Sequence, residues 1–176
     1  MMLRTIALAG ASAALLAATP LLAHDGQHPT DAEIAHIAYT AGQLDVAAGK
    51  QALAKAQNKE VRAFAETMVR DHAAVNEQAL ALVKKLGVTP QANATSEALS
   101  AQAAAEAKKL EALSGAAFDK AYVANEAAYH RTVNEALAKT LIPAAHNPEL
   151  KSLLETGLAL FGQHQSHAEH LAQSLR

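Results

Sequence analysis

The stretch DKAYVANEAAYHRTVNEALAKTL, residues 119–141, carries ionisable residues where a helix would bury apolar ones. Alternating steps of four and three residues, the spacing of a coiled-coil seam, place seven of its positions on one helical face. Four of these are apolar, and the others are Asp119, Glu126 and His130. An unpaired buried charge is costly, and it shifts its pKa or finds a partner. This face therefore predicts either a polar site or ionisable residues that neighbours satisfy.

Three other predicted helices carry further ionisable residues at or beside their apolar stripes. These are Asp45 in the first helix, Asp71 and His72 in the second, and His164 and His167 in the last. Imidazole and carboxylate groups together are the ligands of borderline metals such as Fe, Zn, Cu or Mn. A lone histidine in an apolar seam is more often a hydrogen-bonded core residue. Each position therefore has a structural interpretation beside the metal-binding one.

The elements that must position these residues are helices. Alanine and leucine dominate the sequence and aromatic residues make up only 3% of it, a composition typical of an all-helical chain. Capping residues, glycines and prolines bound helices over about 31–56, 59–86, 96–113, 116–142 and 148–175, with Pro143 ending the fourth. The third of these is short of apolar anchors. The pattern predicts an all-α four-helix bundle of two antiparallel hairpins joined by a helical crossover.

In such a bundle the polar residues of all four long helices fall at one level. The second and fourth helices run parallel, and His72 and His130 each lie roughly 20 Å below their helix starts at 1.5 Å per residue. Folding each hairpin about its turn brings further residues to the same layer or close to it. The predicted layer holds Asp45, Asp71, His72, Glu126, His130 and His164, with His167 at Val123 or a turn above it. Asp119 lies about 10 Å above Glu126, where it either anchors a helix start or meets His167.

The amino terminus has the layout of a secretory signal peptide. Residues 1–23 carry one positive charge at Arg4, then an apolar run, then small residues, so we expect cleavage after Ala23 or, alternatively, Ala18. A retained membrane anchor fits less well because Pro20 interrupts the run and the run is short for a membrane span. We therefore predict a periplasmic or otherwise exported protein with no transmembrane span after cleavage.

Composition also excludes several classes of function. The chain has no cysteine, so it has neither a disulfide framework nor a cysteine nucleophile. Its net charge of −2 gives no basic surface for nucleic acid. It has no His-Glu-x-x-His zinc motif, no phosphate-binding glycine loop and no GxSxG elbow. No residue is therefore assigned a catalytic role, and the sequence indicates neither a partner nor an oligomeric state.

Several segments resemble a known family. They are MVRDH at 68–72 followed by Asn76, LSGAAFDKAYV at 113–123, AAYH ending at His130, and the histidine at 167. These resemble the bacterial exported family called domain of unknown function 4142, whose members are often labelled predicted outer membrane proteins and are regarded as ferritin-like bundles. The resemblance covers about residues 31–175 and implies a ferritin-like fold and an extracytoplasmic location. The family pattern falls on Asp71, His72, Asp119, Tyr122, His130 and His167.

The sequence departs from related patterns at two points. The first helix of the family commonly has a glutamate where this chain has Asp45, a shorter side chain. Di-iron ferritin-like proteins supply Glu-x-x-His from two helices, whereas Glu126 and His130 are four residues apart. This spacing argues against an oxygen-activating di-iron oxidase.

Two functional hypotheses follow. In the first, the bundle core binds a transition metal through His72, His130, and His164 or His167, with Glu126, Asp45 and Asp71, for sequestration, sensing or mild redox chemistry. In the second, the same residues form a satisfied polar network, and the protein is a metal-free stress-protective or interaction module.

Overall fold

The computed structural model describes residues 28–175. The predicted signal peptide, residues 1–23, lies outside this range. The helical elements in chain order are α1 (Asp31–Lys55), α2 (Lys59–Leu86), α3 (Ala94–Glu111), α4 (Gly115–Ala136), the π-helical turn η1 (Leu137–Leu141), α5 (Ile142–Ala144) and α6 (Pro148–Ser174). The described part of the chain contains no β-strand.

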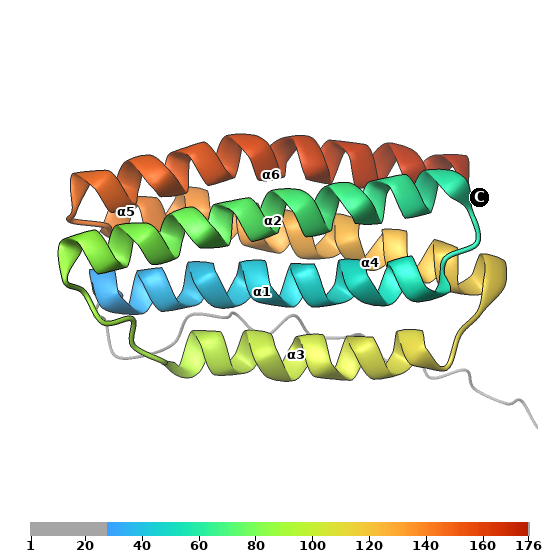
Figure 1. Cartoon of the computed structure of the whole chain (residues 1–176), viewed down its shortest axis with the longest axis horizontal. Coiled ribbons are helices and arrows are strands. Elements are labelled where there is room, and N and C mark those ends of the chain that lie inside the picture. The colour runs from blue at the N-terminus through green and yellow to red at the C-terminus, as the bar shows by residue number, and fades with distance from the viewer. Residues whose placement is uncertain (1–27, 176) are drawn as a thin grey trace, which may run out of the picture.

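Four long helices form the bundle, and a fifth lies against it. Figure 1 shows α1 and α2 as one antiparallel hairpin, α4 and α6 as a second, and α3 outside them beside α1. Helices α2 and α4 run in the same direction, as do α1 and α6. The predicted all-α bundle of two antiparallel hairpins with a helical crossover is therefore confirmed, and it is the single-crossover topology of ferritin-like folds.

The helix ends follow from local sequence chemistry. Thr30 and Glu33 form a capping box at the start of α1. Asn58 accepts hydrogen bonds from the amides of Glu60 and Val61 at the start of α2, which fixes that start at the predicted residue. Gly87 ends α2 with φ 66°, a left-handed conformation that favours glycine. Helix α3 begins two residues before the predicted position because Asn93 caps it through the amide of Ser96.

The prediction that Pro143 ends the fourth long helix is wrong. The helix continues as η1 and α5 through Pro143 to Ala144. Proline lacks an amide proton, and its ring clashes with the carbonyl four residues earlier in a regular α-helix. The π-type bond from the Ile142 amide to the Leu137 carbonyl widens the preceding turn. We attribute the continuation of the helix past the proline to this wider turn.

Each hairpin turn is held by an aspartate of the other hairpin. Asp119 at the start of α4 accepts hydrogen bonds from the amides of Gln57 (3.1 Å) and Asn58 (2.9 Å), in the α1–α2 turn. Asp31 at the start of α1 accepts from the amides of His146 (2.8 Å) and Asn147 (2.9 Å), before α6. Asp119 thus anchors the start of a helix, one of its two predicted roles, although the helix is α2 and not its own.

The core consists of two apolar clusters with a polar layer between them. One cluster includes Phe64, Met68, Phe118, Tyr122 and Leu171, near the α1–α2 turn. The other includes Ile34, Leu137, Leu141, Leu150 and Phe161, toward the opposite end. Between them along the four long helices lie the buried polar residues Asp45, His72, Glu126, His130 and His164. Within residues 28–175, no helix combines the length and the apolar character that crossing a lipid bilayer requires.

Candidate metal centre

Three side chains from three helices meet at the centre of the polar layer. The Nε2 atoms of His72 on α2 and His130 on α4 are 3.4 Å apart, so the two histidines are level, as the helix rise predicts. Asp45 Oδ2 on α1 lies 3.4 Å from His72 Nε2 and 3.5 Å from His130 Nε2. Ligand atoms of a tetrahedral metal with bonds of about 2.0–2.1 Å are about 3.3–3.4 Å apart. The triangle therefore has the dimensions of one face of a metal coordination sphere.

Two further residues enlarge this donor set. One ligand atom from each of His72, His130 and His164 lies within 4.8 Å of the other two, and the same holds for Asp45, Glu126 and His130. All five side chains are buried. The two groups share His130, so three imidazoles and two carboxylates form one continuous cluster, in which Glu126 Oε2 lies 3.7 Å from His130 Nδ1.

Hydrogen bonds outside the cluster orient two of the imidazoles. His130 Nδ1 lies 3.0 Å from the Glu126 carbonyl oxygen, which can only accept, so Nδ1 donates and Nε2 keeps its lone pair for the cluster. His164 Nε2 donates in the same way to Asp71 Oδ2 at 3.0 Å. The other ring nitrogen of His164, Nδ1, is buried and has no hydrogen-bond partner within residues 28–175. A carboxylate or carbonyl behind a histidine is the usual support of a metal ligand.

The cluster is not satisfied by protein groups. Both carboxyl oxygens of Asp45, Glu126 Oε2, and the Nδ1 atoms of His72 and His164 are buried and have no hydrogen-bond partner among the described residues. Buried polar atoms are paired in the great majority of cases, and an unpaired one is destabilising. The second hypothesis, a satisfied polar network, therefore requires partners for these atoms beyond the side chains of residues 28–175.

Burial shifts the pKa values of these groups toward their neutral forms. Burial raises the pKa of Asp45 to about 8. Burial, and then the charge of nearby Asp45, raise the pKa of Glu126 well above its usual range. Burial lowers the pKa of His72 to about 3 and that of His130 to about 4. Both imidazoles are thus neutral at pH 7 with lone pairs available, which is the protonation state that binds metals.

Asp71 differs from the two inner carboxylates. Its side chain is 18% exposed, and Arg70 Nε donates to its Oδ1 at 2.8 Å. Burial alone would raise the pKa of Asp71, but the hydrogen bonds from Arg70 and His164 outweigh burial and lower it. Asp71 is therefore an ionised support for His164 at the edge of the layer.

A groove leads from the surface to the carboxylate side of the cluster. It has a volume of about 360 Å³, lies between α1, α3 and α4, and reaches Asp45 and Glu126. The polar residues Gln51 and Asn125 line it, and its α3 wall combines three alanines with larger residues such as Leu99 and Leu110. The groove thus comes close to the two carboxylates, which are themselves 2% and 1% exposed.

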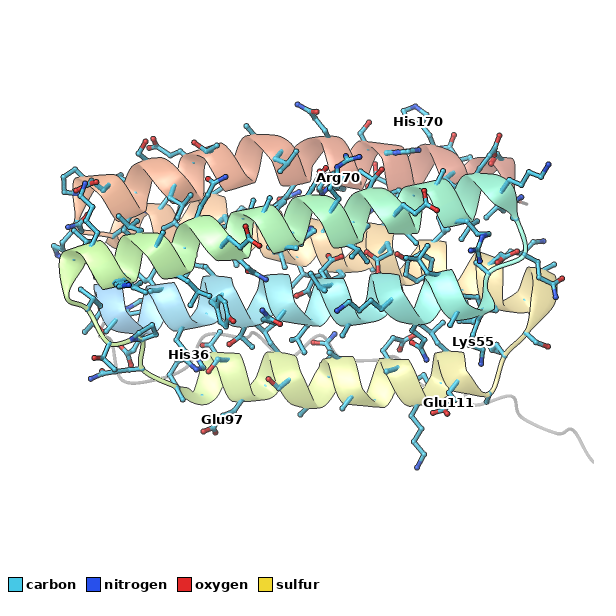
Figure 2. All side chains as sticks on the ribbon, viewed as in Figure 1. His36, Lys55, Arg70, Glu97, Glu111 and His170 are labelled. Atoms are coloured by element: carbon cyan, nitrogen blue, oxygen red, sulfur yellow. The ribbon has the colours of Figure 1, made fainter. Side chains whose placement is uncertain are left out.

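Two of the predicted ligands do not reach the cluster. The Asp119 carboxylate is engaged with the α1–α2 turn. His167 is exposed, and its ring packs edge-on against Phe64 with the ring centroids 5.1 Å apart. His167 is three residues after His164, a step that rotates a side chain by about 60° from the first on a helix of 3.6 residues per turn. His170 also points away from the bundle, on the outer side of α6 (Figure 2).

The structure adds residues that sequence reasoning missed. Phe161 stacks on the His72 ring, with centroids 4.5 Å apart and an interplanar angle of 8°. Asn76 is buried beside Gly42, where a Cβ atom would come within 2.3 Å of Asn76 Oδ1. Asn76 is four residues after His72 and so on the same helical face. That spacing was the signal from which a role beside His72 could have been found.

A comparison with known proteins assigns the chain to a protein family. No curated protein and no solved structure matches the chain significantly. The family model described as "Domain of unknown function (DUF4142)" matches residues 16–171. Because this match spans most of the 176 residues and confirms the resemblance of the sequence motifs, the chain belongs to the DUF4142 family.

Proposed function

We propose that the protein binds a transition-metal ion at the centre of its bundle. His72, His130 and Asp45 form the primary donor set, and His164 and Glu126 complete it. The observation that carries the proposal is the triangle of ligand atoms with edges of 3.4–3.5 Å from three different helices. Neither oxygen of Asp45 has another hydrogen-bond partner among the described residues.

Charge balance supports a divalent ion. Asp45 and Glu126 are 2% and 1% exposed, so both carboxylates ionised without a counter-charge would be very costly. A divalent cation between them makes the site neutral while the three imidazoles remain uncharged. A bound cation is often the largest local charge in such a site, and it lowers the pKa values of the carboxyl groups around it. The raised pKa values of the two carboxyl groups therefore describe the metal-free protein only.

The donor set favours retention of an ion over turnover at an open coordination position. Five protein donors leave few positions for a substrate, whereas catalytic zinc sites keep one open with three protein ligands. Nitrogen and oxygen donors without thiolate suit Fe, Zn, Cu and Mn. Within the proposal, sequestration is the role that this closed arrangement fits best.

Metal content of the untagged protein tests the proposal. We expect one ion per chain by elemental analysis, and a melting temperature that falls with chelator and recovers with added metal, because an ion bound only by the folded state stabilises it. The double variant His72→Ala/His130→Ala should lose the ion. The double variant His36→Ala/His170→Ala is the matched control, since His36 is only half-buried on α1 and His170 lies on the outer side of α6. Equal metal content in both variants would overturn the proposal.

The alternative is the metal-free stress-protective or interaction module. It requires the cluster to be satisfied without an ion. Melting that neither chelator nor added Fe, Zn, Cu or Mn changes would favour it over metal binding.

We also propose that the protein acts after export to the periplasm or beyond, on the strength of the signal-peptide pattern at residues 1–23. Expression of the full chain followed by cell fractionation and mass spectrometry tests this. The expected product is a periplasmic protein that begins at His24. An unprocessed chain in the cytoplasm would contradict it.

A further inference from the structure

A large apolar cavity begins at the histidine side of the cluster. It has a volume of about 570 Å³, and His72 and His130 form part of its wall. The rest is mainly aliphatic or aromatic and comes from all four long helices and η1, including Ile37, Val75, Leu82, Leu137, Leu154 and Phe161. Cavities of about 300–1,000 Å³ with apolar walls and a few polar groups are the usual sites of small-molecule binding.

Small residues keep this space open. Ala41, Gly42, Ala79 and Gly157 line the cavity at positions that face the interior of the bundle. Larger side chains at such positions are what ordinarily fill the space between helices, and protein interiors are close-packed. Apolar walls that are left exposed to water are unfavourable in proportion to their area. A bound apolar molecule would cover them.

One end of the cavity is polar, and its hydrogen-bonding atoms are unpaired. Asn76 lines the wall, is 4% exposed, and its Nδ2 has no hydrogen-bond partner among residues 28–175. Nδ1 of His72, one turn earlier on α2, is also buried without a partner. A buried NH₂ group without an acceptor is destabilising. These two side chains indicate where the oxygen of a ligand would lie.

The opposite end is aliphatic. Leu82 also lines the cavity, and it is ten residues after His72 on α2. At 1.5 Å per residue, this separation is about 15 Å along the helix axis. The space is therefore elongated along α2 and mainly apolar, although polar side chains of α4 and η1, among them Arg131, Glu135 and Lys139, also line it.

We propose that this cavity binds an unbranched aliphatic molecule with an uncharged terminal oxygen, such as a primary alcohol of about ten carbon atoms, whose extended zigzag chain is shorter than the roughly 15 Å between the levels of His72 and Leu82. The head-group oxygen accepts a hydrogen bond from Asn76 Nδ2, and the chain runs along α2 toward Leu82. An uncharged head group is assigned because Asn76 is buried and uncharged, and a charged group buried beside it would be costly to desolvate. The inference stands on the cavity and Asn76 and does not depend on a bound metal.

Calorimetric titration of chelator-treated protein with 1-decanol tests the inference. We expect saturable binding of one molecule per chain and nuclear Overhauser contacts between decanol and the Leu82 methyl groups. Ala79→Phe, which fills the cavity, should weaken binding at least tenfold, whereas Ala81→Phe, at an exposed position on the same helix, should bind decanol as the wild type does. Asn76→Leu should weaken binding roughly tenfold through loss of one hydrogen bond.

Absence of saturable binding to the wild-type protein would overturn the inference, as would wild-type affinity in Ala79→Phe or tighter binding of decanoate than of decanol. The Overhauser contacts are measured on the wild-type chain, so the test stands even where a variant fails to fold. Because the titration uses chelator-treated protein, its result is separate from that of the metal analysis. Failure to bind decanol would not contradict the metal proposal, and absence of metal would not contradict decanol binding.

Discussion

His164 donates from Nε2 to the Asp71 carboxylate at 3.0 Å, which joins α6 to α2 at the edge of the polar layer. Because this bond engages Nε2, Nδ1 is the His164 nitrogen that can bind a metal ion in the cluster. Supports of this kind typically contribute 10–100-fold to metal affinity. We therefore expect Asp71→Ala to keep one ion per chain but to raise its Kd by roughly 10–100-fold, as measured by competition with a chelator of known affinity.

Arg70→Ala is the control for this prediction. Arg70 is exposed on α2 (Figure 2). Its Nε atom contacts Oδ1 of Asp71, the oxygen that does not bind His164. Its removal leaves the bond from Asp71 to His164 in place, so the Kd should change by less than a few-fold. If Asp71→Ala bound metal as tightly as the wild type, His164 would not belong to the donor set.

Metal affinity should rise with pH between about 6 and 8. The Asp45 carboxyl has a pKa of about 8 in the metal-free protein, so at pH 7 an ion must displace its proton. His72 and His130 do not contribute to this pH dependence of the metal affinity, because their pKa values lie near 3 and 4. Calorimetric titrations in buffers of different ionisation enthalpy should show proton release on binding at pH 7. A constant affinity from pH 6 to 8 would contradict this account.

The metal-free protein should lose stability as pH rises from about 6.5 to 8. Asp45 has a pKa of 3.8 in its unperturbed form and about 8 in the fold, so the folded state binds more protons in this interval and stability falls as pH rises through it. His72 and His130 act in the opposite direction, because their pKa values in the fold lie below the usual 6.5. Below pH 6.5 the unfolded chain therefore binds more protons at these histidines than the folded chain, and stability falls as pH falls. Below pH 6.5 the carboxyl groups and the two histidines therefore oppose each other, and above it only the carboxyl groups act, so the decline is expected above pH 6.5.

Denaturant unfolding at several pH values, with and without metal, measures this effect. Asp45→Asn should flatten the decline above pH 6.5, because the amide does not titrate. The metal-bound protein should also lack the decline, since its carboxylates are already ionised. A metal-free protein whose unfolding free energy rises from pH 6.5 to 8 would show that the inner carboxyl groups are not held neutral.

Asp119 should act on stability and not on metal binding. Asp119→Ala leaves the amides of Gln57 and Asn58 without their acceptor, which we expect to lower the unfolding free energy by about 1–3 kcal/mol. Metal content should remain one ion per chain. Glu111→Ala, at an exposed position where α3 ends (Figure 2), should change stability by less than about 0.5 kcal/mol. Loss of the ion in a folded Asp119→Ala protein would return Asp119 to the ligand set.

The level of the cluster along the bundle could be predicted from the sequence, because this level depends on the repeating geometry of the helices. The start of α2 is fixed by a recognisable cap, and the rise per residue is constant, so the match of His72 with His130 could be derived from counting. The partner of Asp119 could not be derived in this way. Its acceptor atoms meet backbone amides of the other hairpin, and those amides have no side-chain signature.

Two other features depended on local geometry that a periodic pattern does not contain. The rule that proline ends a helix holds for a proline that follows a regular α-helix. The turn over η1 is wider than an α-helical turn, so the rule does not apply at Pro143. Asn76 is buried because Gly42 on α1 leaves room for it, which involves a contact between two helices. The orientation of His164 likewise depends on Asp71, on another helix.

The division of the donor set between the two hairpins has a consequence for how the chain unfolds. The α1–α2 hairpin supplies Asp45 and His72, and the α4–α6 hairpin supplies Glu126, His130 and His164, so neither half holds the full set. An ion bound at their junction would have to dissociate before the hairpins could separate, and it would therefore slow unfolding. In a chain without cysteine, such an ion would be a reversible cross-link between distant segments, as a disulfide is in proteins that contain one.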